Sequence, residues 1–306
     1  MMKKNFFNSN FLIVGLARNC GKVINKQVNK INEAFIETAS TKWLIVESDS
    51  DDNTIEELNS LSHKLNLKYI SLGVLRDKYP KRTERISVCR NYYLSEIDNN
   101  SDYDYIDYVV VVDLDGVNLE LTHSSLKTCW EQKVDWDVCF ANQSAPYYDI
   151  RALRHEIWSP NDCWENSQFL INNGISQFSA ESTSVWSRMI HIDNRAQPIE
   201  VDSAFGGLGI YKKNVITDCR YSGLNKNRNE ICEHVSFNMQ IKNKGYKLYI
   251  IPTLINGGWN EHNSNLKIYK RINKKLYYYI IKFVTIFISK QKLKNYLRKL
   301  LNLAGR

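Results

Sequence analysis

The sequence lacks several features that would place it in a special class of protein. None of its seven cysteines has a partner at CxxC spacing, which argues against a zinc site or a disulfide framework and favours reduced, buried thiols. No apolar stretch is long enough for a confident membrane span. With 43% hydrophobic and 24% charged residues, the composition is that of a globular protein. The 306 residues allow one large α/β domain or two small ones.

Near the N-terminus, an apolar run resembles a weak signal peptide. Residues 11–17 (FLIVGLA) follow Lys3 and Lys4, but the run is only seven residues long. Arg18 and Asn19 come next, where a cleavage site would have small side chains. We therefore interpret residues 11–17 as the first buried strand.

Acidic residues are absent from the last part of the chain. Residues 266–306 hold twelve Lys or Arg and no Asp or Glu, so residues 1–265 carry a formal charge of −4 although the whole chain carries +8. Aromatic and apolar side chains alternate with these cations, which favours an amphipathic helical tail on an anionic membrane surface over a nucleic-acid-binding arm. The alternative is a helix that packs against the domain. We expect a folded domain over 1–265 and a membrane-associating tail over 266–306.

Short apolar runs alternate with polar helical patterns through the first half of the chain. Such runs are typical of parallel strands that are buried on both faces. We expect strands at 11–17, 42–48, 68–73, 107–116 and 136–143. This alternation predicts an α/β fold, a doubly wound sheet with helices on both faces.

The second half of the chain is less regular. Residues 144–200 predict long loops rich in Trp, Tyr, Asn and Ser, and residues 199–213 predict a strand, a glycine turn and a strand. A helix over 232–245 that ends at a glycine and a strand over 246–252 follow.

The strongest local signal is the sequence VVVVDLDG at 109–116. Four valines predict a buried strand, and two aspartates follow where that strand ends. Side chains alternate along a strand, so Asp113 and Asp115 are expected on one side and Leu114 on the other. Two neighbouring carboxylates repel each other unless a cation lies between them, and Mg²⁺ or Mn²⁺ prefers oxygen ligands. The alternative is a solvated turn after the strand.

With four other blocks, this motif makes the chain resemble the GT-A glycosyltransferases, which implies the GT-A fold, a Rossmann-like, doubly wound mixed sheet. The nearest branch is that of the capsule-associated and α-1,3-mannosyltransferase-like proteins and their bacterial counterparts. The other blocks are LARNC (16–20), VESDSDDNT (46–54), CRNYYL (89–94), and FGGLGIYK (205–212) paired with CEHVSFN (232–238). The likeness extends from residue 16 to about residue 252, and the order and spacing of the blocks are more specific than any one block.

Nine residues become candidates for binding a nucleotide-sugar donor. Carboxylates after a strand can accept hydrogen bonds from a ribose or a base, arginine suits a phosphate, and glycine allows close approach of a ligand. In GT-A enzymes the glycine segment lies beside the transferred sugar. The candidates are Ala17, Arg18, Asn19, Glu47, Asp49, Arg90, Asn91, Gly206 and Gly207. The alternatives are a helix cap in the acidic loop, a structural ion pair for Arg90 and a plain hairpin for the glycines.

The resemblance also implies a base and a further metal ligand. Many inverting GT-A enzymes carry an acidic pair at a helix start, and this chain has Glu233 and His234 there. A helix N-terminus disfavours the cationic form of histidine, so a neutral imidazole is expected near pH 7. His262 is a candidate third metal ligand, with a solvated loop histidine as the alternative. The aromatic-rich stretch 147–164 is a candidate for the acceptor side, with core packing as the alternative.

The resemblance therefore implies a glycosyltransferase that moves a sugar from a GDP- or UDP-sugar to a glycan or lipid-linked acceptor, with Mn²⁺ or Mg²⁺. We expect a role in surface polysaccharide synthesis and a peripheral location at the cytoplasmic face of a membrane. Nucleic acid is not an expected partner. The alternatives are an inactive glycan-binding or scaffold protein, and a sugar-nucleotide nucleotidyltransferase. The latter normally has a glycine-rich loop after the first strand, and this chain has only Gly15 and Gly21 there.

Overall fold

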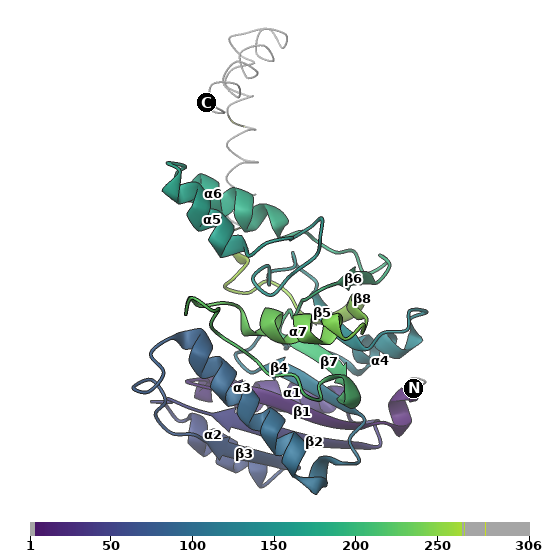
Figure 1. Ribbon diagram of the computed structural model, residues 1–306. Coiled ribbons are helices and arrows are strands. Elements are labelled where there is room, and N and C mark those ends of the chain that lie inside the picture. Colours follow the sequence, from purple (N-terminus) through teal and green to yellow (C-terminus); the bar gives the residue numbers. More distant parts are fainter. Residues whose placement is uncertain (1–3, 265, 267–278, 280–306) are drawn as a thin grey trace. The chain divides into compact units, whose positions relative to one another are not determined.

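The computed structural model describes residues 4–264, 266 and 279. The chain divides into two compact units, Met1–Asn260 and Glu261–Arg306, and the fold described below is that of the first unit (Figure 1). The predicted tail over 266–306 lies outside the described residues except at two positions, so its helical and membrane-binding character stays a prediction. Among the helices that the structure describes, none combines the length and apolarity that a membrane crossing needs.

The first unit is built on one sheet of eight strands in the order β3-β2-β1-β4-β7-β5-β8-β6. β7 runs antiparallel to β4 and β5, and β6 runs antiparallel to β8, while the other pairings are parallel. The mixed, doubly wound α/β sheet predicted from the sequence is therefore confirmed. The strands are β1 (Asn10–Ala17), β2 (Ser40–Glu47), β3 (Leu67–Ser71), β4 (Tyr108–Asp113), β5 (Val138–Gln143), β6 (Ile199–Val201), β7 (Leu208–Lys212) and β8 (Leu248–Gly257).

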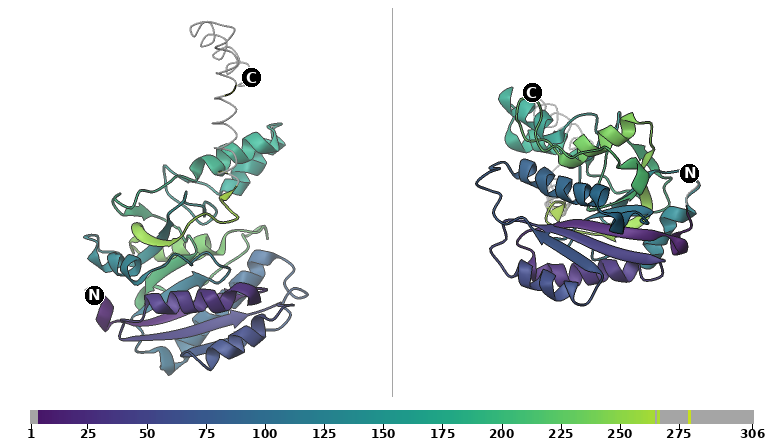
Figure 2. Two further views of the ribbon diagram at one scale, coloured as in Figure 1. Left: turned by 180° about the vertical axis from the view of Figure 1, so that it is seen from behind. Right: turned by 60° about the horizontal axis from the view of Figure 1, so that its bottom comes forward.

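Helices cover both faces of this sheet (Figures 1 and 2). Along β1, Leu12 and Val14 pack into the core beneath α3 and α7, while Phe11 and Ile13 pack into the core beneath α1, α2 and α4. This alternation is the reason that β1 is apolar at every position after its first, since a strand buried on both faces needs an apolar side chain at each residue. The helices are α1 (Gly21–Ala34), α2 (Thr54–Ser62), α3 (Arg82–Asn99), α4 (His123–Glu131), α5 (Cys163–Asn172), α6 (Gln177–Ser184) and α7 (Glu233–Asn243).

The region between β5 and β6 differs from the sequence expectation. Residues 144–200 were expected to form long loops, but they include α5 and α6, which pack against each other (Figure 1). Both helices are short and rich in Asn, Ser and Gln, so they lack the broad apolar stripe that makes a helix recognisable. The described part of the unit also contains four short 3₁₀ turns: η1 (Phe6–Asn8), η2 (Ser101–Tyr103), η3 (Trp186–Arg188) and η4 (Lys213–Val215).

The predicted strand, glycine turn and strand over 199–213 does form, but its strands do not pair with each other. β7 is inserted between β4 and β5, and β6 lies at the edge beside β8. A plain hairpin, which the sequence left open, is thereby excluded. The glycine turn instead connects two distant positions in the sheet and crosses the end of β4.

The strand order places a topological switch point between β1 and β4. From β1 the chain proceeds outward to β2 and β3, and it then returns to place β4 on the other side of β1. Connections leave the two neighbouring strands in opposite directions, which opens a crevice at their carboxyl ends. Open α/β sheets bind their ligands at such a crevice, so β1 and β4 position the candidate site.

Candidate active site

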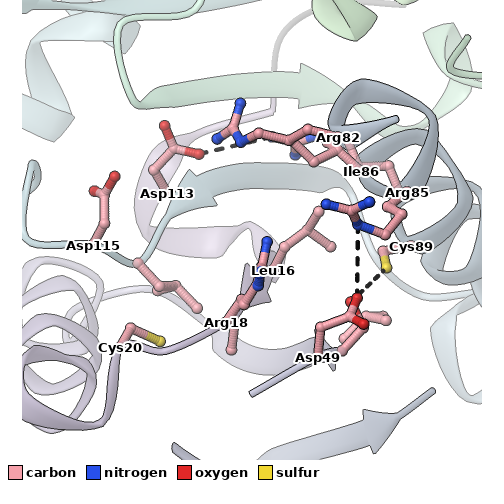
Figure 3. Close-up of a pocket in the computed structure, with 15 residues that line it drawn as sticks. Leu16, Arg18, Cys20, Asp49, Arg82, Arg85, Ile86, Cys89, Asp113 and Asp115 are labelled. Carbon is pink, nitrogen blue, oxygen red and sulfur yellow. Dashed lines mark hydrogen bonds and ion pairs between the residues drawn. The ribbon is translucent and has the colours of Figure 1, made fainter. Parts of the chain in front are cut away.

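A cavity of about 190 Å³ lies at the switch point (Figure 3). Segments at the carboxyl ends of β1, β2 and β4 form three of its walls, and residues 82–90 of α3 form the fourth. The predicted donor and metal residues Ala17, Arg18, Asp49, Arg90, Asp113 and Asp115 all line this cavity. The structure thus brings together residues that are up to about a hundred positions apart in the sequence.

Asp113 and Asp115 lie at the carboxyl end of β4, as predicted from the sequence. Both residues line the cavity together with Leu114, which also packs into the apolar core on the α1 side of the sheet. The side chain of Asp113 keeps 36% of its surface exposed. Withdrawal from bulk water, followed by the nearby Asp115 carboxylate, raises the pKa of Asp113 well above its usual value, and the Arg90 guanidinium opposes this shift. A cation bound between the two carboxylates would therefore offset their mutual repulsion.

The donor set fits a hard divalent cation that also binds a substrate. Mg²⁺ in such sites is held by one or two carboxylates and completes its shell with water and phosphate oxygens. Within the described residues, no group of three or more His, Cys, Asp or Glu side chains could hold a metal ion. Asp113 and Asp115 therefore remain the two candidate protein ligands at this site. His262 belongs to the second unit, where its Nε2 lies 3.6 Å from Oε1 of Glu261, and its role as a metal ligand stays a prediction.

Two arginines on α3 line the cavity and were not singled out from the sequence. Arg82 and Arg85 are three residues apart and share one helical face with Cys89, which also lines the cavity. Arg18 lies across from them after β1 (Figure 3). Guanidinium groups around a dicarboxylate suit a phosphate group that arrives with a divalent cation. The signal that could have found Arg82 and Arg85 is this helical spacing of long cationic side chains on one face.

The segment after β1 is shaped by its contacts with the loop after β2. Asn19 adopts a left-handed conformation with φ of 48°. Its backbone N–H donates to Ser50 Oγ at 3.2 Å, and its Oδ1 accepts from the Asp51 N–H at 2.7 Å. Asn19 does not line the main cavity but a second, more open hollow beside it, which shares Arg18 and Asp115 with the first. Asn19 therefore shapes the loop and is placed beside the first cavity.

The two acidic residues at the end of β2 have different surroundings. Asp49 lines the cavity, and its Oδ1 accepts from the backbone N–H groups of Leu75 and Arg76, both at 2.9 Å. Burial raises the pKa of Asp49, but these two N–H groups and the Arg85 guanidinium outweigh burial and lower it overall. Oδ2 of Asp49 has no hydrogen-bond partner, and Arg85 Nε lies 3.8 Å from it. Asp49 therefore stays anionic in the cavity wall, where its side chain is almost fully buried.

Glu47 is buried at 1% exposure and does not line the cavity. Its carboxylate accepts hydrogen bonds from the Ser50 N–H and the Ser71 hydroxyl, so it holds the loop after β2. Asn91 is also engaged elsewhere. Its side-chain amide donates to Tyr221 O at 2.9 Å and accepts from the Tyr221 N–H at 2.8 Å, which fastens the segment before α7 to α3. Both side chains act on the shape of the site and make no contact with its cavity.

The Gly206–Gly207 turn lies against the end of β4, as expected for a segment beside the site. Gly207 has φ of 84°, and a Cβ there would come within 2.7 Å of Val117 Cγ2 and 3.0 Å of the Tyr148 hydroxyl. The Asp113 N–H donates to Gly207 O at 3.0 Å. The turn therefore requires glycine, and it sets the backbone position of a candidate metal ligand.

Buried amides hold this turn, and no sequence pattern indicates them. Asn118 Nδ2 donates to Asp113 O and to Gly207 O, at 2.8 and 3.0 Å. Asn256 Nδ2 and Gln143 Nε2 both donate to Gly206 O, at 2.8 and 3.0 Å. Three side chains from separate segments thus satisfy the carbonyls of one turn. Amides in three unrelated segments share no spacing, so no local pattern could have grouped them.

The predicted Glu233–His234 pair does begin a helix, α7, but both residues are buried. Glu233 Oε1 accepts from Arg90 Nε at 3.2 Å. His234 stacks on Phe205 with ring centroids 3.7 Å apart, and neither of its ring nitrogens has a hydrogen-bond partner. Burial first, and Arg90 second, lower the pKa of His234 well below its usual value. The neutral imidazole agrees with the sequence expectation, but its cause is burial and a neighbouring cation.

Neither Glu233 nor His234 lines the cavity, so the catalytic role proposed for them stays a prediction. Glu233 reaches the cavity only through Arg90, which lines it. Glu233 is thus the better placed of the two, because it contacts a residue of the donor site and His234 faces aromatic rings.

Comparisons with known proteins recover similar folds only. No protein-family model and no curated protein matches the chain. Among solved structures, TarS 1-349 from S. aureus with UDP-GlcNAc is 15% identical, with a TM-score of 0.47 over 83% of this chain and 60% of that one. The mannosyltransferase PcManGT from Pyrobaculum calidifontis, with GDP-Man and Mn²⁺, is 12% identical, with a TM-score of 0.47 over 81% of this chain and 56% of that one.

Glucosyl-3-phosphoglycerate synthase from Mycobacterium tuberculosis, with Mn²⁺, UDP and glucosyl-3-phosphoglycerate, is 10% identical, with a TM-score of 0.43 over 83% of this chain and 72% of that one. The chain therefore spans less than two thirds of the first two of these structures. At such identities and TM-scores the activity has to be argued from the side chains of the site.

Proposed function

We propose that this protein is a metal-dependent glycosyltransferase that uses a nucleotide-sugar donor. The observation that carries the proposal is the pair Asp113 and Asp115 at the switch point, which lines one cavity together with Arg18, Arg82 and Arg85 (Figure 3). A dicarboxylate binds a divalent cation, and arginines bind phosphate oxygens. The ligand that satisfies both at once is a diphosphate with its cation.

The residues of the chain divide the work of transfer among them. Asp113 and Asp115 would hold Mn²⁺ or Mg²⁺, which as a Lewis acid offsets negative charge on a leaving diphosphate. Arg18, Arg82 and Arg85 bind and orient the phosphate groups. Because their charges are in place before the reaction, they stabilise the developing charge without reorganisation.

The nucleoside and sugar have separate places in this proposal. Asp49 lines the cavity and has one carboxylate oxygen without a hydrogen-bond partner, so it is the candidate acceptor for the nucleoside of a GDP- or UDP-sugar. The Gly206–Gly207 turn, which accepts a hydrogen bond from the Asp113 N–H, is the candidate neighbour of the transferred sugar. Glu233 is the candidate base for an acceptor hydroxyl, and the buried imidazole of His234 packs beside it.

The acceptor and location follow from the sequence resemblance and the tail. We infer a glycan or lipid-linked acceptor in surface polysaccharide synthesis, within the capsule-associated and α-1,3-mannosyltransferase-like branch. The twelve cations in 266–306 support peripheral attachment to the cytoplasmic face of an anionic membrane.

A donor screen tests the proposal. The full chain is incubated with GDP- and UDP-sugars, with Mn²⁺ or with EDTA, and release of the nucleoside diphosphate is measured. We expect release from one donor class in Mn²⁺ and none in EDTA. Donor binding without any turnover across the screen would favour an inactive glycan-binding protein, and nucleotide-sugar synthesis from a sugar phosphate would favour a nucleotidyltransferase.

A further inference from the structure

Arg90 occupies the space between the two acidic parts of the site. It lies midway along α3 and is 4% exposed. Its Nη2 is 3.7 Å from Asp113 Oδ1, and its Nε donates to Glu233 Oε1 at 3.2 Å. One guanidinium thus faces a candidate metal ligand from β4 and a candidate base from α7.

The remaining surfaces of this guanidinium are also occupied. Nη1 donates to the Tyr93 hydroxyl at 3.4 Å. The rings of Phe205 and Tyr221 lie with their centroids 5.6 and 5.5 Å from Cζ, within the range of cation–π contact. The sequence predicts that Arg90 binds a donor phosphate. In the structure, however, its guanidinium is already directed at the carboxylates of Asp113 and Glu233.

The two carboxylates do not share Arg90 equally. The contact with Glu233 is a hydrogen bond, while the contact with Asp113 is an ion pair beyond hydrogen-bond distance. A divalent cation on Asp113 would repel Arg90 and take over the neutralisation of that carboxylate. The charge of Arg90 would then act on Glu233 alone.

We propose that Arg90 is a positioning residue that couples the cation site at Asp113 to Glu233. Before a divalent cation binds, its charge is shared between Asp113 and Glu233, and afterwards it acts on Glu233 alone, so the cation and Glu233 influence each other through one guanidinium. This inference rests on the proposed function, because it requires Asp113 to hold a cation. Linkage makes the coupling reciprocal: a change at Glu233 alters cation affinity, and cation binding alters the environment of Glu233.

Mn²⁺ affinity of the full chain tests the coupling directly. Free Mn²⁺ is counted by electron paramagnetic resonance during titration, once with Mn²⁺ alone and once with saturating UDP or GDP. In Glu233→Gln, the whole charge of Arg90 acts on Asp113, so Mn²⁺ affinity should fall about five-fold or more. In Arg90→Gln, the competing charge is gone, so affinity should rise by a similar factor while turnover falls.

The double variant and two controls show whether the effect of Glu233 passes through Arg90. In the Arg90→Gln background, Glu233→Gln should change Mn²⁺ affinity far less than it does alone, because the charge that connects the two carboxylates is missing. Arg90→Lys keeps the charge and should return the affinity to near the wild-type value. Asp98→Asn removes a surface ion pair of the same helix, with Arg220 at 2.8 Å, and should leave it unchanged.

Each outcome either supports or overturns the coupling. If Glu233→Gln binds Mn²⁺ as the wild type does, and Arg90→Gln does not bind it more tightly, the coupling is wrong and the proposed function stands. If the wild type binds no Mn²⁺ even with UDP or GDP, the proposed function fails together with the coupling. Should Arg90→Gln not fold, which urea unfolding detects, Glu233→Gln alone decides, because a purely structural role would not lower its Mn²⁺ affinity.

Discussion

The two halves of the first unit place their functional residues by different means. In residues 10–115, helical crossovers connect four parallel strands; the carboxylates of the site follow strand ends, and Arg82, Arg85 and Arg90 lie on the crossover helix α3. In residues 138–257, β7 and β6 run antiparallel to their neighbours, and the residues near the site are held by long-range contacts such as Arg90 with Glu233. The first set of residues is placed by position along a strand or helix, whereas the second set is placed by tertiary hydrogen bonds.

This difference explains which site residues can be predicted from the sequence. A carboxylate at a strand end is placed by periodicity and topology, which are visible in the sequence. A glycine turn or a helix start is placed by whatever surrounds it. We therefore expect substitutions in the first half to cause the largest loss of activity. Substitutions in the second half should lower both stability and activity.

Asp113→Asn or Asp115→Asn should nearly abolish transfer, by about a thousand-fold, because a neutral amide cannot bind the cation that offsets the leaving-group charge. The measurement is turnover of the donor identified by the screen, in Mn²⁺. EDTA should act like the substitution, and added Mn²⁺ should restore only the wild type. The matched control is Asp135→Asn, whose carboxylate is 78% exposed and pairs with Lys212 at 3.6 Å, and it should stay fully active. Full activity of either variant would refute the metal assignment.

Gly207→Ala should lower turnover about ten- to hundred-fold and also destabilise the fold. The new Cβ would lie 2.7 Å from Val117 Cγ2 at a φ of 84°, and relief of this clash moves the carbonyl that receives the Asp113 N–H. Gly245→Ala is the control, because φ is 88° there but no atom lies within 4 Å of the new Cβ. It should cost about 1–2 kcal/mol in urea unfolding and leave turnover unchanged. Equal effects of the two variants would show that the turn does not position Asp113.

The sequence predicted the sheet and the strand-end residues because each depends on a short pattern. Four valines predict β4, and the two aspartates predict the site at its carboxyl end. The apolar run of β1 indicates a strand that is buried on both faces. The amides Asn118, Gln143 and Asn256 could not be predicted, because hydrogen bonds between distant segments leave no periodic trace. The helices α5 and α6 were missed for a related reason: few of their residues face an apolar core.

His234→Phe should change the pH dependence of stability. The pKa of His234 is lowered in the folded chain, so the unfolded chain binds more protons below its ordinary value of 6.5. Stability contributed by the neutral imidazole is therefore complete above about pH 6.5 and is lost as pH falls toward the folded pKa. Phenylalanine keeps the stack on Phe205 and cannot be protonated.

Urea unfolding of both proteins at pH 7.5 and pH 5.5 measures this difference. Relative to His234→Phe, the wild type should lose about 1 kcal/mol at the lower pH. Donor affinity, measured by calorimetry, should be the same for both proteins, and turnover should fall if His234 supports Glu233. A parallel pH response in the two proteins would place the imidazole in contact with water, and loss of donor affinity would place it on the donor side.

Deletion of residues 266–306 should have the smallest effect on catalysis, because both halves of the site lie within residues 10–257. Turnover on a soluble acceptor should stay within about two-fold of the full chain, whereas binding to anionic vesicles should be lost. Each of the twelve cations contributes about 1 kcal/mol where it reaches an anionic surface, and apolar side chains such as Ile280 and Phe283 add burial at the interface. Co-sedimentation with vesicles over a salt series measures this, and binding of the full chain should weaken as salt rises. If the shortened chain binds vesicles equally well, another surface carries the attachment; if it unfolds, the tail belongs to the core and the two-part division of the chain is wrong.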